Sequence, residues 1–201
     1  MNPFFRPALV GALAASCVLA AGSIAAHDSH ALPDRGPGTD ASTADSAWIR
    51  SPLVSKVRAA TRRYKDINVA LGEGWVPATP CVTGPNEGAM GVHYVLPARV
   101  GDGMLRADQP EALIYEPRPD GRMSLVGIEF IVIAEHWNTQ HPEAQPSLDG
   151  HLLNLVGEPN RYRLPAFYEL HVWAWEHNPD GAFVDWNRGV SCEAQPQPPV
   201  S

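Results

Sequence analysis

The sequence predicts an α+β fold, with a mainly antiparallel β-sheet or sandwich and one long N-terminal amphipathic helix. A helical apolar stripe occurs only once, between Ser51 and Gly72. After Trp75, short runs of β-forming residues alternate with prolines and glycines. Pro-Asp-Gly turns at residues 117–122 and 178–181 each separate two such runs, as expected for hairpins.

The predicted helix has start and stop signals at both ends. Ser51 can cap its first turn, Pro52 suits the first helical position, and Gly72 can end it. Apolar residues then recur at spacings of three and four, so one face of the helix should be buried. These residues are Leu53, Val57, Ala60, Tyr64, Ile67 and Leu71.

Strands are predicted from residue 92 onwards. The first is Val92 to Val95, and a hairpin follows from the runs 112–116 and 124–134. Nearly every residue from Leu125 to Ile133 is apolar, which is typical of a strand buried on both faces at the centre of a sheet. A polar loop is expected at 138–150. Residues 151–156 fit a strand or a short helical turn equally well.

A second hairpin is expected near the C-terminus. In its first strand the two-residue period places Glu169 and His171 on one face, together with Trp173 and Trp175. Residues 178–181 then form the turn, and residues 182–186 the returning strand.

The ends of the chain differ in composition from this domain, which should cover residues 47–193. Residues 1–26 combine one arginine with an apolar run and a small-residue cleavage pattern, which predicts a signal peptide and a periplasmic or secreted protein. Residues 27–46 and 194–201 have the composition of a disordered leader and a disordered tail. Residues 14–17 loosely resemble a lipidation motif at Cys17, but the apolar run continues past it, which favours soluble export.

Net charge limits the class of partner. The whole chain carries −7, and removal of residues 1–26 takes away one arginine and no acid, which leaves −8. An acidic protein is repelled by nucleic acid and by anionic lipid, so we expect no nucleic-acid partner and no membrane partner after signal cleavage. The charge leaves open which small molecule, glycan or protein binds.

The mature chain would retain two cysteines, Cys81 and Cys192. In an oxidising compartment an even number of cysteines is typical of a disulfide. We therefore predict that these two residues are paired.

Glu129 is the most informative single residue, because a carboxylate inside an apolar strand needs a cation, hydrogen-bond donors or a metal. His93 and His171 lie on two other predicted strands. Together the three side chains could hold one divalent ion (Zn, Fe, Mn or Cu), with His151 or Glu169 as a fourth ligand or an outer partner. Whether such a protein is also an enzyme is left open by the sequence.

The alternative hypothesis is a non-catalytic binding or interaction module. In that case the histidines and Glu129 form a purely structural polar cluster. Trp173, Trp175 and Tyr94 would then line a surface that docks a glycan or a protein partner.

Three segments carry a resemblance to a known family. They are GAMGVHY (Gly88 to Tyr94), LVGIEF (Leu125 to Phe130) and FYELHVWAWEHNPDGAFVDWNRGVSC (Phe167 to Cys192). With the preceding helix they make residues 55–193 similar to a family of uncharacterised secreted bacterial proteins. The resemblance implies a shared fold and no assigned activity, so it adds no catalytic residue. The spacing of the histidines and Glu129 departs from the cupin metal motif.

Overall fold

The computed structural model describes residue 48 and residues 50–195, all within one compact unit. The signal peptide, Cys17 and the leader at 27–46 lie outside the described residues, as does the end of the tail at 196–201. Among the described residues, no helix is both long enough and apolar enough to cross a membrane.

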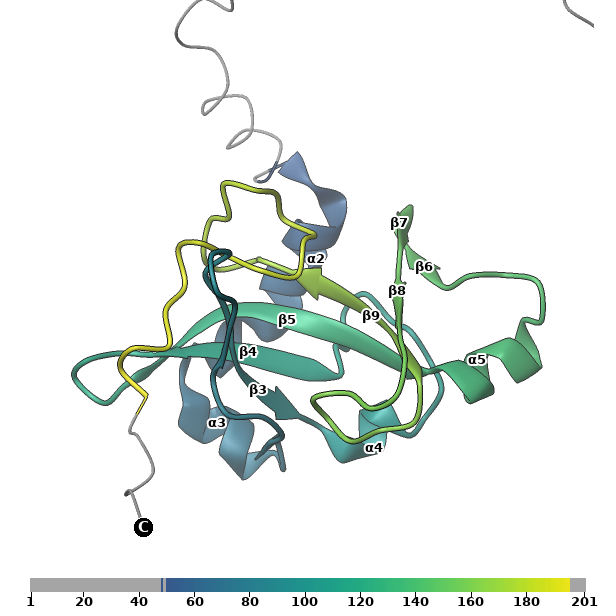
Figure 1. Cartoon of the computed structure of the whole chain (residues 1–201), viewed down its shortest axis with the longest axis horizontal. Helices are drawn as coiled ribbons and strands as arrows, with labels where there is room; N and C mark the ends of the chain where they lie inside the picture. The colour runs from purple at the N-terminus through teal and green to yellow at the C-terminus, as the bar shows by residue number, and fades with distance from the viewer. Residues whose placement is uncertain (1–47, 49, 196–201) are drawn as a thin grey trace, which may run out of the picture. The chain divides into compact units, whose positions relative to one another are not determined.

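The centre of the fold is one seven-stranded sheet in which every neighbouring pair of strands is antiparallel (Figure 1). Its order is β1-β3-β4-β5-β9-β8, and β2 also pairs with β3; β6 and β7 form a separate two-stranded sheet. The α+β class and the mainly antiparallel sheet are therefore confirmed. The strands are β1 (Val76–Pro77), β2 (Val82–Thr83), β3 (Ala89–Val95), β4 (Ala112–Pro117), β5 (Met123–Ile133), β6 (Ser147–Leu148), β7 (His151–Leu152), β8 (Asn154–Val156) and β9 (Phe167–Val172).

Residues 52–72 are helical but divide into three consecutive segments instead of one continuous helix. These are α2 (Pro52–Thr61), the 3₁₀ turn η1 (Arg62–Lys65) and α3 (Ile67–Gly72). The break falls at Asp66, which has extended backbone angles and whose side chain accepts a hydrogen bond from the Asn68 amide at 3.0 Å. Asp66 therefore caps α3 as a new helix.

These three helical segments cover one face of the sheet (Figure 1). Their apolar side chains pack against residues of β4, β5 and β9 to form the largest hydrophobic core. Its fully buried large side chains include Leu53, Tyr64, Trp75, Leu113, Tyr115, Ile128 and Phe130. The prediction that Leu125 to Ile133 is buried on both faces is confirmed, since all nine residues are buried.

Two segments without regular structure contribute to the other face. Residues 157–166 contact it through Tyr162 and Leu164, and residues 182–192 through Val190 and Cys192. Cys192 is joined to Cys81, as predicted, with a Cα–Cα distance of 5.6 Å. The disulfide therefore fastens the end of the second segment to the chain just before β2.

The C-terminal hairpin and the polar loop differ from prediction. Residues 182–186 form no strand, and β9 ends at Val172. One backbone hydrogen bond joins the two segments, from the Trp173 amide to the Ala182 carbonyl. A tight turn follows β9, in which the Ala174 amide donates to the Val172 carbonyl. After Ala174 the side chains no longer alternate between the two faces of the sheet. The expected loop begins as helix α5 (Ala134–Gln140), and α4 (Pro97–Val100) is a further short helix.

Candidate metal centre

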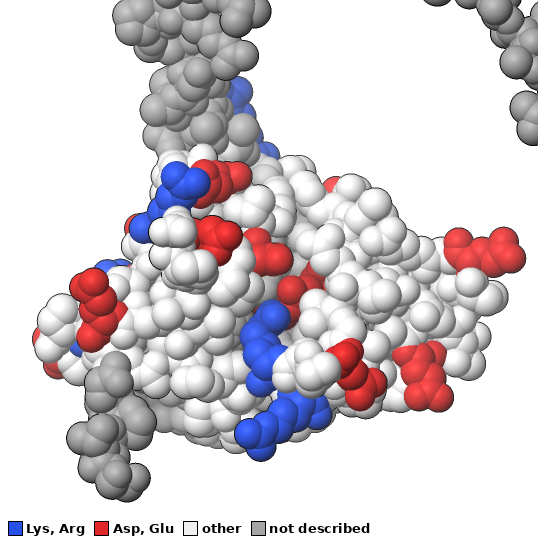
Figure 2. Space-filling view, in the orientation of Figure 1, with Lys and Arg blue, Asp and Glu red and all other residues white. Residues whose placement is uncertain are grey.

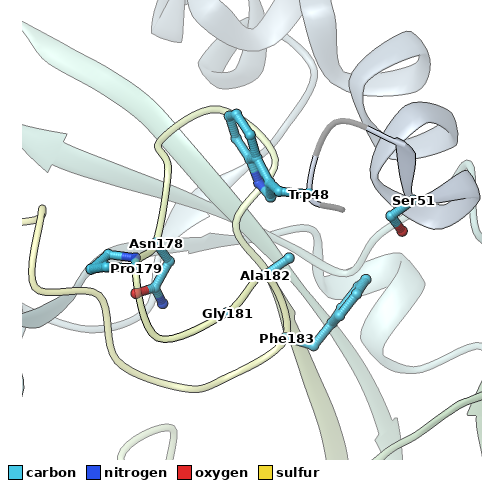
Figure 3. Close-up of a pocket in the computed structure, with 7 residues that line it drawn as sticks. All are labelled: Trp48, Ser51, Asn178, Pro179, Gly181, Ala182 and Phe183. Carbon is cyan, nitrogen blue, oxygen red and sulfur yellow. The ribbon is translucent and has the colours of Figure 1, made fainter. Parts of the chain in front are cut away.

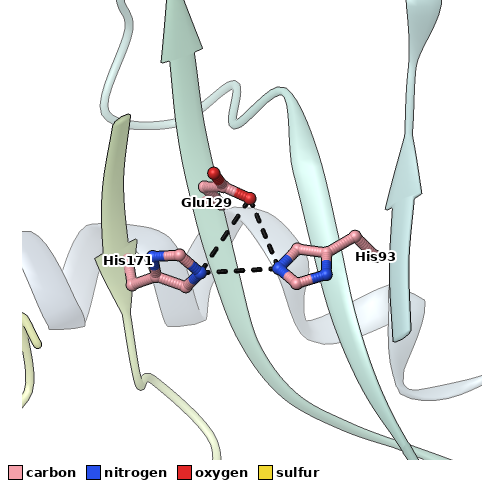
Figure 4. A group of neighbouring side chains, drawn as sticks. All are labelled: His93, Glu129 and His171. Carbon is pink, nitrogen blue, oxygen red and sulfur yellow. Dashed lines mark hydrogen bonds and ion pairs between the residues drawn. The ribbon is translucent and has the colours of Figure 1, made fainter. Parts of the chain in front are cut away.

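Three interior strands place His93, Glu129 and His171 on the face opposite the helices (Figure 4). Glu129 on β5 is the direct cross-strand partner of His171 on β9. His93 comes from β3, which is separated from β5 by β4. Ala112 of β4 lies opposite Glu129, and its small side chain leaves room for the histidine and the carboxylate to meet across the intervening strand.

The three side chains direct their polar atoms toward one point (Figure 4). The Nε2 atoms of His93 and His171 lie 3.4 Å apart. Glu129 Oε2 lies 3.4 Å from the first of these nitrogens and 4.0 Å from the second. All three side chains are 0% exposed. The sequence-predicted ligand set is therefore brought together in the structure.

Each histidine has a polar side chain next to its other ring nitrogen. Thr79 Oγ1 lies 3.1 Å from Nδ1 of His93 and also accepts a hydrogen bond from the His93 amide. Asp185 Oδ1 lies 3.4 Å from Nδ1 of His171, although the two atoms do not form a hydrogen bond. Such outer partners are usual for metal-binding histidines, because they fix the ring orientation and the tautomer.

Glu129 is also bonded by two residues of the covering segment 157–166. Arg161 Nη2 donates to Glu129 Oε1 at 2.8 Å and to Glu169 Oε2 at 2.5 Å. The Tyr162 hydroxyl donates to Glu129 Oε2, the oxygen that faces the histidines. The carboxylate is thus satisfied in the structure by a cation and a phenol, as its burial requires.

Burial changes the protonation equilibria of this cluster. Burial lowers the pKa of His93 well below its usual range, and the nearby His171 and Arg161 lower it further, so the ring is neutral. Burial raises the pKa of Glu129, and the Glu169 carboxylate adds to that effect, whereas Arg161 opposes it. The neighbouring His171 ring lowers the pKa of Asp185. A neutral imidazole is the form that binds a metal.

Two candidates for a fourth ligand are placed differently. Glu169 lies beside the cluster and, with His171 and Asp185, forms a second group of potential ligands. His151 lies outside both groups, and its ring stacks on Phe183 at 3.7 Å.

Four neighbours of the cluster were not predicted, and all four lie outside strands: Thr79, Arg161, Tyr162 and Asp185. Two of them reach solvent, since the side chains of Arg161 and Asp185 are 20% and 37% exposed. Figure 2 shows acidic and basic side chains next to each other near the middle of this face.

The predicted aromatic surface is not assembled. Trp173 is fully buried and donates to the Val184 carbonyl. Trp175 lies on the helix side, where its Nε1 donates to Thr61, and Tyr94 packs against Tyr115 on that side. A different aromatic hollow of about 280 Å³ lies between α2 and the C-terminal turn (Figure 3). Its lining includes Trp48, Ser51, Asn178, Pro179 and Phe183.

No protein-family model, curated protein or solved structure matches this chain. Its function is therefore inferred from the geometry of its own residues. The resemblance to uncharacterised secreted bacterial proteins stays a prediction.

Proposed function

We propose that this chain is an exported protein that binds one divalent transition-metal ion through His93, Glu129 and His171. The observation that carries the proposal is the triangle of ligand atoms, with sides of 3.4, 3.4 and 4.0 Å. A point equidistant from all three atoms lies about 2.1 Å from each, which matches the bond lengths of zinc to imidazole nitrogen and carboxylate oxygen.

The donor set and its surroundings support the same proposal. Two imidazoles and one carboxylate suit Zn, Fe, Mn or Cu, and zinc imposes the least demand on geometry. His93 is neutral because of its burial, so an ion need not displace a proton from it. Thr79 and Asp185 lie beside the outer nitrogens, so both Nε2 atoms remain directed at the carboxylate.

Export is supported by the predicted signal peptide and by the Cys81–Cys192 disulfide. Disulfides persist in oxidising compartments, where an exported protein would meet its metal. The proposal is therefore of a periplasmic or secreted metal-binding protein.

The competing hypothesis is that the cluster is purely structural. It is favoured by one observation: Arg161 and Tyr162 already satisfy both oxygens of Glu129 without a metal. In that case the chain would act as a binding module through another surface. The two hypotheses differ in metal content and in the effect of metal on stability.

The first test is elemental analysis of protein purified without a metal-affinity tag, where the proposal expects about one metal per chain. The second compares the wild type with Glu129→Gln, which removes the charge and keeps the volume. We expect affinity for zinc to fall about 10-fold or more, because a neutral amide is a poor ligand. An ion at 100 times its dissociation constant stabilises the native state by about 2.7 kcal/mol, and the variant should lose most of this gain.

Matched variants make this test decisive. Glu143→Gln makes the same change on the surface and should retain the full response to zinc. Asp185→Asn changes a partly exposed neighbour of His171 and should weaken zinc binding about 10-fold without unfolding the domain. Equal melting temperatures of the wild type in chelator and in excess zinc, manganese, iron or copper would refute the metal proposal in favour of the structural cluster.

A further inference from the structure

A second hollow lies beside the cluster and shares one wall with it. Its volume is about 480 Å³, it is open to solvent, and it is bordered by β3, α4, the junction of β5 with α5, and residues 157–166. Tyr162 forms the shared wall, because it lines this hollow while its hydroxyl bonds Glu129. We call it the Tyr162 pocket. Figure 1 shows α4 and the segment before β9 on the same side of the sheet.

The lining of the Tyr162 pocket is almost entirely apolar. Val95, Val100, Ile133 and Leu164 are four of its apolar lining residues, and they belong to one continuous hydrophobic cluster. Ligand pockets of proteins are typically concave and apolar with a few polar groups, and they have volumes of about 300–1,000 Å³. Both the size and the walls of this pocket therefore fit a small organic molecule.

The polar side chains in the lining are Glu135, His136 and Tyr162, so the pocket has one carboxylate and no lysine or arginine. Glu135, at the first turn of α5, lines the pocket and has no ion-pair partner among the residues that the structure describes. The nearby Arg99 of α4 is directed elsewhere, since its Nη1 donates to the Pro110 carbonyl and its guanidinium lies over Trp75. An unpaired carboxylate at an apolar pocket favours a cation and disfavours an anion.

We propose that the Tyr162 pocket binds a small apolar molecule that carries one ammonium group, with the apolar part against Val95, Val100 and Leu164 and the ammonium group at Glu135. The inference goes beyond metal binding and does not depend on it. None of the three proposed metal ligands lines the pocket.

Three probes with the same ring test the charge preference: cyclohexylmethylamine, cyclohexylmethanol and cyclohexanecarboxylate. Binding is followed by methyl NMR of the full-length protein in chelator, so that metal plays no part. For a probe of this size a dissociation constant of about 1 mM is expected. The amine should bind about 3- to 5-fold more tightly than the alcohol, as is usual for a partly exposed ion pair, and the carboxylate should bind most weakly. The shifted methyl signals should be those of Val95, Val100, Ile133 and Leu164.

Two variants and one control identify the groups responsible. Glu135→Gln, at an exposed position, should bind the amine and the alcohol within about 2-fold of each other. Ala78→Leu adds apolar volume inside the pocket and should abolish binding of all three probes while leaving the melting temperature unchanged or higher. Glu143→Gln removes the same charge away from the pocket and should keep the preference for the amine.

Three results would overturn the inference. The first is equal binding of the amine and the alcohol by the wild type. The second is the absence of shifts at about 10 mM probe, roughly ten times the expected dissociation constant. The third is a set of shifts confined to the hollow lined by Trp48 and Phe183. Because the measurement is made in chelator, none of them bears on whether Glu129 and the histidines bind a metal.

Discussion

Replacing Arg161 with methionine should reveal how strongly the buried carboxylates depend on one cation. Arg161 Nη2 lies 2.8 Å from Glu129 and 2.5 Å from Glu169, whose side chains are 0% and 3% exposed. Removing one partner of a buried ion pair costs about 3–5 kcal/mol, because the remaining charge is left uncompensated. The arginine is itself 20% exposed, so water can partly replace it, and we expect the lower value of about 3 kcal/mol. In a domain of this size that corresponds to a fall in melting temperature of about 10 °C.

The loss should depend on pH in a defined direction. Burial raises the pKa of Glu129, and Arg161 opposes this rise, so the variant should raise the pKa further. A carboxyl group with a raised pKa in the folded state binds a proton that the unfolded chain has released. Its contribution to stability is therefore lost as pH rises above the unfolded value of about 4.5. Arg161→Met should cost less stability at pH 5 than at pH 8.

Urea denaturation of the wild type and the variant, in chelator at pH 5 and pH 8, measures both quantities. Arg163→Met is the matched control, because it removes the same charge from an exposed side chain two residues away. We expect the control to change the free energy of unfolding by less than about 0.5 kcal/mol. A loss below about 1 kcal/mol for Arg161→Met, or an equal loss at the two pH values, would refute the reasoning.

Two other perturbations test features away from the cluster. The double substitution Cys81→Ser and Cys192→Ser opens a covalent loop whose ends are 111 residues apart in sequence. It should lower the free energy of unfolding by about 4–5 kcal/mol, as measured by urea denaturation. The mass of the wild-type protein should rise by that of two hydrogen atoms on reduction. Gly88→Ala should destabilise the domain by more than about 3 kcal/mol, because an added Cβ would lie 2.1 Å from the Asn187 carbonyl oxygen. Gly121 has a similar positive φ but open space around it, so Gly121→Ala should lose only about 1 kcal/mol in the same assay. Equal losses for the two alanine variants would contradict the clash.

The parts of the fold that the sequence predicted are those with strong periodicity. The apolar run from Leu125 to Ile133 correctly indicated a central strand, because a strand buries every residue only where both faces of the sheet are covered. The helical stripe after Ser51 indicated the covering layer, although Asp66 divides it. Alternation holds through Ala174 and fails at Trp175, whose amide donates to the carbonyl of Val126, a residue distant in sequence.

The candidate site was only partly predictable. Glu129 could be identified because it is the single carboxylate in an apolar strand. A buried carboxylate needs polar partners, and histidines on other strands were candidates for that role. Arg161, Tyr162 and Asp185 carry no such signal. They lie on segments without periodicity, and their distance from Glu129 is fixed only by how those segments fold over the sheet. The space that Ala112 leaves between His93 on β3 and Glu129 on β5 could be recognised only from the strand order, which hairpin patterns alone do not predict.

The order of strands in the sheet has a consequence for how the protein is made. His93 and His171 are 78 positions apart, and they meet only when β3, β4, β5 and β9 are all paired. Pairings between residues so far apart in sequence form slowly, because the chain between them must be ordered first. During synthesis, no nascent chain that ends before residue 171 contains the whole triangle. We therefore expect its three atoms to come together late in folding, after β3, β4, β5 and β9 have paired.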